Sequence, residues 1–212
     1  MTLAWLMALL AIASEAFPLL AVIALRRRVR GARLWVVAWC TFLLAWDLTS
    51  LCVSWHGHSN LWLTYVLEPV GIALVLWSLS LWQLRELPRL TMRFALVPFV
   101  VAWVVLTVAF EDTSGFSRAA DPMAALLGLG AAAYTLLARA GRSRGDLLRC
   151  DWLWVCGGMA LYFGTGTALQ PLAALLIAQD PQLVVLAYDA KAALDVAAFL
   201  AIARGVTCPT GT

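Results

Sequence analysis

Residues 61–83 read LWLTYVLEPVGIALVLWSLSLWQ, an apolar run that contains a single charged side chain, Glu68. A helix crosses the hydrocarbon core of a bilayer with about 20 consecutive apolar residues, so this run predicts a membrane-spanning helix. The whole chain has the same character, because 63% of its 212 residues are hydrophobic and 13% are charged. In globular domains, about 45–50% of residues are apolar and about 25% are charged. The composition therefore excludes an ordinary soluble domain.

Six further stretches of the chain share this apolar character. Together they predict an all-α polytopic membrane protein, a seven-helix bundle that forms one transmembrane domain over residues 1–212. The seven candidate spans cover approximately residues 3–25, 34–54, 61–83, 94–110, 122–138, 151–178 and 183–203.

The basic residues indicate an orientation in the membrane. Arginine and lysine are retained in cytoplasmic loops, and the arginines of this chain follow the first, third, fifth and seventh spans. Of the loops on the opposite side, only the one with Arg118 contains an arginine. We expect the N-terminus outside and the C-terminus inside, in a bacterial inner membrane. Short clusters of this kind do not make the basic stripe that nucleic-acid binding requires.

Six ionisable residues lie within the candidate spans, where charge is costly and is by default a sign of function. Because successive spans alternate in direction, four of them are expected at a similar depth toward the outer leaflet: Asp47, Glu68, Asp189 and Lys191. These four can line one polar cavity that binds a small molecule or an ion. The other two ionisable residues, which we also include among the candidate ligand-binding residues, are Glu15 and Asp195.

Lys191 is the single lysine of the chain, since the other fourteen basic residues are arginines. A desolvated lysine amine can lose its proton and then form a Schiff base or exchange protons with a carboxylate. The alternative is structural, because Asp195 lies one helical turn away on the same face and can form an ion pair with Lys191.

The sixth span contains a run of small and polar residues from Gly164 to Pro171. Such a run is expected to weaken or unwind the helix, and broken helices mark binding sites in transporters. Thr165, Thr167 and Gln170 are therefore candidate ligand-binding residues. The alternative is a simple proline kink supported by neighbouring helices.

The chain lacks the motifs of known intramembrane or hydrolytic chemistry. It has no HExxH, no GxSxG and no phosphate-binding glycine loop, and His56 and His58 alone do not complete a zinc site. Its five cysteines include no CxxC pair. We expect neither enzymatic activity nor a metal cofactor.

Seven spans, an outside N-terminus and a lysine in the last span resemble the microbial rhodopsins. The resemblance implies retinal bound to Lys191 as a Schiff base, with Glu68 as counterion. The sequence departs from that family at Ala187, where an aspartate is usual, and in the sixth span, which lacks the W-x-x-Y-P pattern.

The segment NLWLTYVLEPVGIAL, residues 60–74, resembles small uncharacterised bacterial seven-span membrane proteins, which brings no assigned activity. The leading hypothesis is a non-enzymatic membrane protein whose polar cavity binds a small ligand or ion for sensing or translocation. A sensor would need a partner protein in the membrane that reads helix movement. The alternatives are a retinal-binding photoreceptor or pump, and a structural subunit of a membrane complex.

Overall fold

In the computed structural model the chain is a bundle of helices. The structure describes residues 3–26, 28–111, 117–142, 146–177 and 181–208. Helix accounts for 85% of the chain, and the described ranges contain no strand. In chain order the helices are α1 (Leu3–Glu15), α2 (Phe17–Ala24), α3 (Ala32–Trp55), α4 (Leu61–Ser80), α5 (Glu86–Phe94), α6 (Leu96–Ala109), α7 (Ala120–Ala140), the short 3-10 helix η1 (Leu147–Arg149), α8 (Asp151–Ile177) and α9 (Pro181–Thr207).

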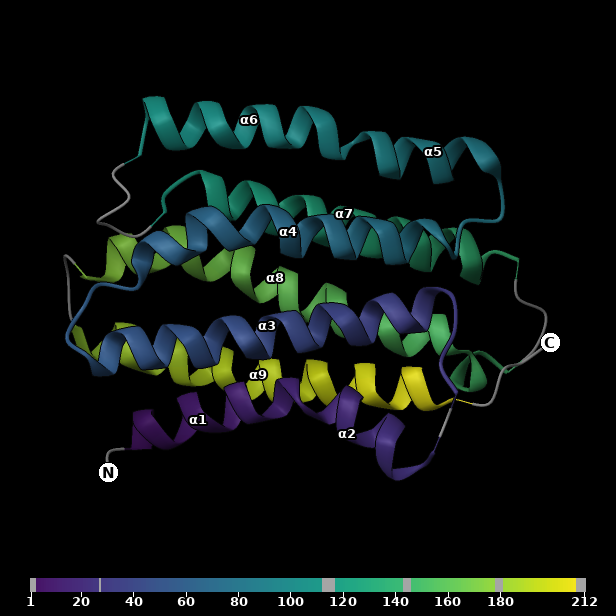
Figure 1. The fold of residues 1–212 in the computed structure, drawn as a ribbon, viewed down its shortest axis with the longest axis horizontal. Coiled ribbons are helices and arrows are strands. Elements are labelled where there is room, and N and C mark those ends of the chain that lie inside the picture. Colours follow the sequence, from purple (N-terminus) through teal and green to yellow (C-terminus); the bar gives the residue numbers. More distant parts are fainter. Residues whose placement is uncertain (1–2, 27, 112–116, 143–145, 178–180, 209–212) are drawn as a thin grey trace.

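The long helices lie side by side, with their axes roughly along the long dimension of the molecule (Figure 1). α8 makes its main contacts with α7 and α9, α3 packs against α4, and α1 packs against α9. α5 and α6 form an outer row at one edge of the bundle, where they contact α4 and α7. The interior of the bundle is thus lined by the buried faces of five helices: α3, α4, α7, α8 and α9.

Several of these helices are suited to a membrane. α3, α4, α7 and the combined body Glu86–Ala109 are each long and apolar enough to span one, and the bent pair α1–α2 makes a fifth candidate. The outward face of α6 is covered with exposed valines, of which Val108 is 80% exposed. A contiguous apolar face of this kind is costly in water and is favourable against lipid. The all-helical, membrane-compatible fold class predicted from composition is confirmed at this level.

Prolines interrupt two of the predicted spans. The first span was expected as one helix, but α1 ends at Glu15 and α2 continues at an angle of 46° to it. Pro18 lies in the first turn of α2 and has no N–H to offer the preceding turn, which explains the bend. The fourth predicted span, residues 94–110, corresponds to α6, and α5 precedes it; the two helices are separated at Ala95, because Pro98 cannot donate to the carbonyl of Phe94.

The sixth span differs from the expectation in the opposite sense. α8 is a continuous α-helix from Asp151 to Ile177, so the predicted unwinding does not occur. The hydroxyls of Thr165 and Thr167 donate to the carbonyls of Tyr162 and Phe163, at 2.8 Å each. These side chains satisfy their own hydrogen-bonding needs within the helix. Gly158, which precedes this run in α8, serves another purpose.

That purpose is close packing between helices. A Cβ atom on Gly158 would lie 2.6 Å from the carbonyl oxygen of Ala198 and 2.7 Å from the side chain of Ile202 in α9. A Cβ on Gly205 of α9 would lie 2.6 Å from Val155 of α8. The two backbones can approach this closely only because both helices have glycine at the contact.

Arginines join helix ends at the end of the bundle that carries the α2–α3 and α7–α8 connections. Arg33 at the start of α3 forms an ion pair with Asp151 of α8 at 3.5 Å and donates to the carbonyl of Cys208 at 2.8 Å. Arg139 of α7 donates to the carbonyl of Trp82 at 2.8 Å. These arginines satisfy carbonyl groups that are left over beyond helix C-termini.

We predict that Gly158→Ala destabilises the protein by about 1–3 kcal/mol, because the added methyl group overpacks the α8–α9 contact. Gly157→Ala is the matched control, since a Cβ there meets nothing within 4 Å. Alanine in place of that glycine is expected to be neutral or to stabilise by up to about 1 kcal/mol. Thermal unfolding in detergent compares the two variants, and equal effects would contradict the packing argument.

Candidate functional site

Lys191 of α9 is held by groups from two helices. Its ammonium donates to the Oδ2 atom of Asp195, one turn further along α9, so the ion pair considered from the sequence is present. The ammonium also lies over the ring of Tyr162 in α8, 5.2 Å from the ring centroid. A cation over an aromatic face is a favourable arrangement at this distance. Both contacts keep the lysine in the interior of the bundle.

A pair of acidic residues lies beside this ion pair. The carboxyl groups of Glu15 in α1 and Asp47 in α3 are close enough to interact electrostatically with each other, with Lys191 and with Asp195. Three helices therefore contribute to one cluster that combines three acids with one lysine. We call Glu15, Asp47, Lys191 and Asp195 the charge cluster.

The members of the charge cluster do not provide hydrogen-bond partners for all of its carboxyl oxygens. Glu15 is 5% exposed and Asp195 is 7% exposed. Within the described ranges, the Oε2 atom of Glu15 and the Oδ1 atom of Asp195 have no hydrogen-bond partner. Buried acceptors of this kind call for a proton or a bound cation.

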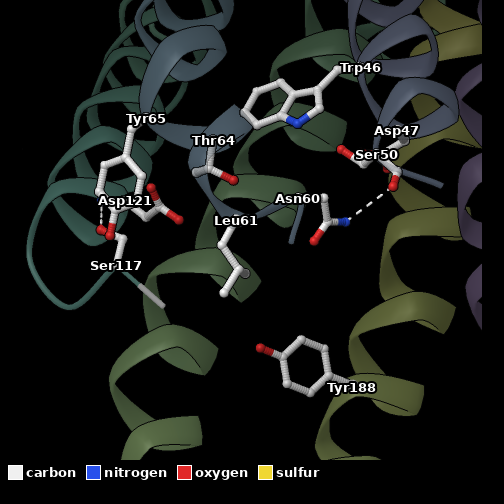
Figure 2. A pocket seen from close by; sticks show the side chains of 10 residues that line it. All are labelled: Trp46, Asp47, Ser50, Asn60, Leu61, Thr64, Tyr65, Ser117, Asp121 and Tyr188. Atoms are coloured by element: carbon white, nitrogen blue, oxygen red, sulfur yellow. Dashed lines mark hydrogen bonds between the residues drawn. The ribbon is translucent and has the colours of Figure 1, made fainter. Parts of the chain in front are cut away.

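A chamber of about 390 Å³ opens next to Asp47, at the end of the bundle that carries the α3–α4 turn. Figure 2 shows Asp121 and Tyr65 on one side of it, Asp47 and Ser50 on the other, and the hydroxyl of Tyr188 directed into the space between. The side chain of Asn60 donates to the carbonyl of Ser50 at 3.3 Å. The described lining comprises Trp46, Asp47, Ser50, Asn60, Leu61, Thr64, Tyr65, Ser117, Asp121 and Tyr188.

Two further spaces share lining residues with the chamber and with the charge cluster. An inner cavity of about 190 Å³ shares Trp46, Thr64 and Asp121 with the chamber, and it adds Glu68 and Lys191. A side groove of about 450 Å³ between α1 and α9 is largely apolar, and it reaches Asp47, Asp189, Lys191 and Asp195. Asp47 lines both the chamber and the groove, and Lys191 lines both the inner cavity and the groove.

The structure brings most of the sequence-predicted residues to these spaces. Glu68 lines the inner cavity with Lys191, and Asp189 lines the side groove. Thr165 and Thr167 use their hydroxyls on their own helix, while Gly166 between them lines the inner cavity. Gln170 belongs to α8, but its side chain lies outside the described residues.

Sequence reasoning missed the residues that make the chamber aromatic and acidic. Asp121 precedes the predicted span of residues 122–138, but it lies in the first turn of α7 and lines both the chamber and the inner cavity. Trp46 lies within the predicted span of residues 34–54 and was not a candidate site residue, but it borders the same two spaces. Tyr65 and Tyr188 had no assigned role. Their positions along the chain could have identified them, because each lies in the part of its helix that is at the same end of the bundle as Asp47.

A carboxylate from outside the helices fixes the rim of the chamber. The Oε1 atom of Glu111 accepts hydrogen bonds from the amides of Ala119 at 2.6 Å and Ala120 at 2.9 Å, and from the hydroxyl of Ser117 at 3.1 Å. Partial burial opposes ionisation of Glu111, but these hydrogen bonds, with one from Tyr65, outweigh it and lower its pKa. Glu111 thus caps the N-terminus of α7, which carries Asp121.

The site therefore belongs to the class of polar cavities inside an apolar helical bundle. In the part of the chain that the structure describes, no group of three or more histidine, cysteine or acidic residues could hold a metal ion. Comparison of this chain with protein-family models, with curated proteins and with solved structures found no match.

We predict that Glu111→Gln lowers stability at neutral pH by about 1 kcal/mol, because it removes a charge-assisted helix cap. The pKa of Glu111 is lowered from an ordinary value of 4.5. The stabilisation is therefore complete above that value and disappears as the pH falls through the lower folded-state pKa. Thermal unfolding between pH 7 and pH 3.5 should show the two proteins converging on acidification. Glu86→Gln, in the exposed first turn of α5, is the control, and a constant difference across the range would contradict the cap.

We also predict strong coupling between Lys191 and Asp195. Lys191→Met or Asp195→Leu alone leaves the other charge in the interior, at an expected cost of about 3–5 kcal/mol. The double variant is expected to recover most of that loss, because no charge is stranded. A thermal-unfolding cycle of the four proteins measures the coupling. Additive losses would show that the two residues act independently.

Proposed function

We propose that this chain is a non-enzymatic integral membrane protein that binds a small ligand or ion in the chamber and inner cavity, and that it uses this binding for sensing or translocation. The observation that carries the proposal is the charge cluster, in which three acids and one lysine lie in the bundle interior beside connected cavities. Charges within apolar helices are costly to insert and are rarely retained without a role. The cavity volume lies within the usual range for small-molecule sites.

In this proposal the bundle crosses the membrane seven times, with α1–α2 and α5–α6 each forming one bent span. The arginine-rich connections after α2, α4 and α7 support a cytoplasmic location for that end. The chamber then opens toward the outer face, and the N-terminus is outside. A bacterial inner membrane is the location that we propose, because short loops and a strong arginine asymmetry are typical there.

The same end of the bundle favours access by solutes. Asp47 and Asp121 line the chamber, Glu111 contacts Ser117 at its rim, and Asp189 lines the neighbouring side groove, so negative charge predominates there. Clefts that are lined by charge of one sign raise the local concentration of oppositely charged solutes.

We predict that at least one class of small solute stabilises the purified protein in detergent. At about 100 times its dissociation constant, a ligand adds about 2.7 kcal/mol, which corresponds to roughly 5–10 °C in Tm for a chain of this length. The panel comprises organic cations, inorganic cations, anions, neutral osmolytes and all-trans retinal. Lys191→Ala should lose the response, whereas Arg149→Ala, in an exposed ion pair at the other end of the bundle, should keep it.

Two outcomes would contradict this function. If no solute in the panel shifts the Tm of wild-type protein, the charges serve assembly and the chain is a structural subunit. If retinal produces a visible absorption band that is absent from Lys191→Ala, the lysine forms a Schiff base and the protein is a photoreceptor or pump.

A further inference from the structure

We propose that the ligand of the chamber is a small organic cation, held by the carboxylates of Asp47 and Asp121 and by the aromatic rings of Trp46, Tyr65 and Tyr188. This inference rests on the proposed function and names its ligand class. The chamber is bounded by three aromatic residues from three helices, α3, α4 and α9. Aromatic faces combined with carboxylates are the arrangement that binds ammonium groups.

The charge of the lining sets the sign of the ligand. Its ten described residues include two acids and no basic residue. Lys191 lies beyond them, in the inner cavity and the groove, and is engaged by Asp195 and Tyr162. An anion in the chamber would face two carboxylates without a compensating cation. A cation would meet one carboxylate on each side of the space (Figure 2).

The mixture of polar and aromatic groups argues for an organic cation over a bare metal ion. In the described part of the chain no cluster of acids and histidines is close enough to replace the hydration shell of a metal. An organic ammonium needs fewer direct ligands, because its alkyl groups pack against rings while one side meets a carboxylate. Ser50, Thr64 and the Tyr188 hydroxyl can then accept or donate hydrogen bonds to a polar substituent.

The test measures binding of choline, tetramethylammonium and n-butylamine to the purified full chain by isothermal titration calorimetry. The neutral comparison is 3,3-dimethyl-1-butanol, which has the shape of choline without its charge. We expect at least one of the three cations to bind. If choline binds, its neutral isostere is expected to bind at least tenfold more weakly than choline. Asp121→Asn and Trp46→Leu should each weaken cation binding at least tenfold, while Asp146→Asn, in the exposed connection at the other end of the bundle, should not change it.

Each other result overturns the inference in a specific way. Equal affinity for choline and its isostere would show that charge is not recognised. Loss of binding in Asp189→Asn but not in Asp121→Asn or Trp46→Leu would place the site in the side groove. If none of the three cations binds while an anion or neutral solute raises the Tm, the proposed function stands and the cation assignment fails. Tm measured without ligand confirms that each variant is folded, and either of the two chamber variants suffices for the test.

Discussion

The close contact of α8 with α9 is the constraint on which the arrangement of the interior depends. Gly158 and Gly205 allow the two backbones to approach until a single methyl group would clash. With α9 held against α8 in this way, Lys191 lies over Tyr162 and within reach of the carboxyls from α1 and α3. On the other side of α8, Gly128 of α7 packs against the ring of Phe163 in the same manner, since a Cβ there would lie 2.8 Å from it. Small residues therefore set the spacing of α7, α8 and α9, and α9 carries two members of the charge cluster, Lys191 and Asp195.

Further toward the centre, aromatic rings fill the volume that the glycines leave between helices. Trp39 of α3 is 1% exposed, and its ring centroid lies 5.5 Å from that of Tyr162 and 6.2 Å from that of Phe199 in α9. Such rings are rigid and large, so they fix the distances between three helices at once. This aromatic core adjoins the cavities at Tyr162, which contacts both Trp39 and the ammonium of Lys191. Phe163, which stacks on Trp39 and also lines the inner cavity, lies at the same boundary between packed interior and open space.

Local patterns in the sequence predicted local features well. The apolar runs predicted where helices form, and the spacing of Lys191 and Asp195 predicted an ion pair within one helix. The proximity of Glu15 to Asp47 was beyond such reasoning, because it depends on which helices become neighbours. The expected unwinding of α8 was wrong because the threonine hydroxyls form hydrogen bonds to the helix's own carbonyls, while Gly164 and Gly166 remain helical at ordinary packing distances from α7. Asp121 and Trp46 were not predicted as site residues for a related reason, because the position of a residue along the chain does not reveal whether its face of the helix borders a cavity.

The position of Lys191 also bears on how a bound cation could act. The inner cavity connects the chamber to Lys191, so a cation that moves deeper meets a like charge next. Passage would require the ammonium to swing aside or to give its proton to Asp195. Either change would alter the contacts between α9 and its neighbours α1 and α8, because Lys191 interacts with groups on both of them. Under the proposed function, binding in the chamber would therefore be linked to helix packing through one side chain, which favours sensing over translocation.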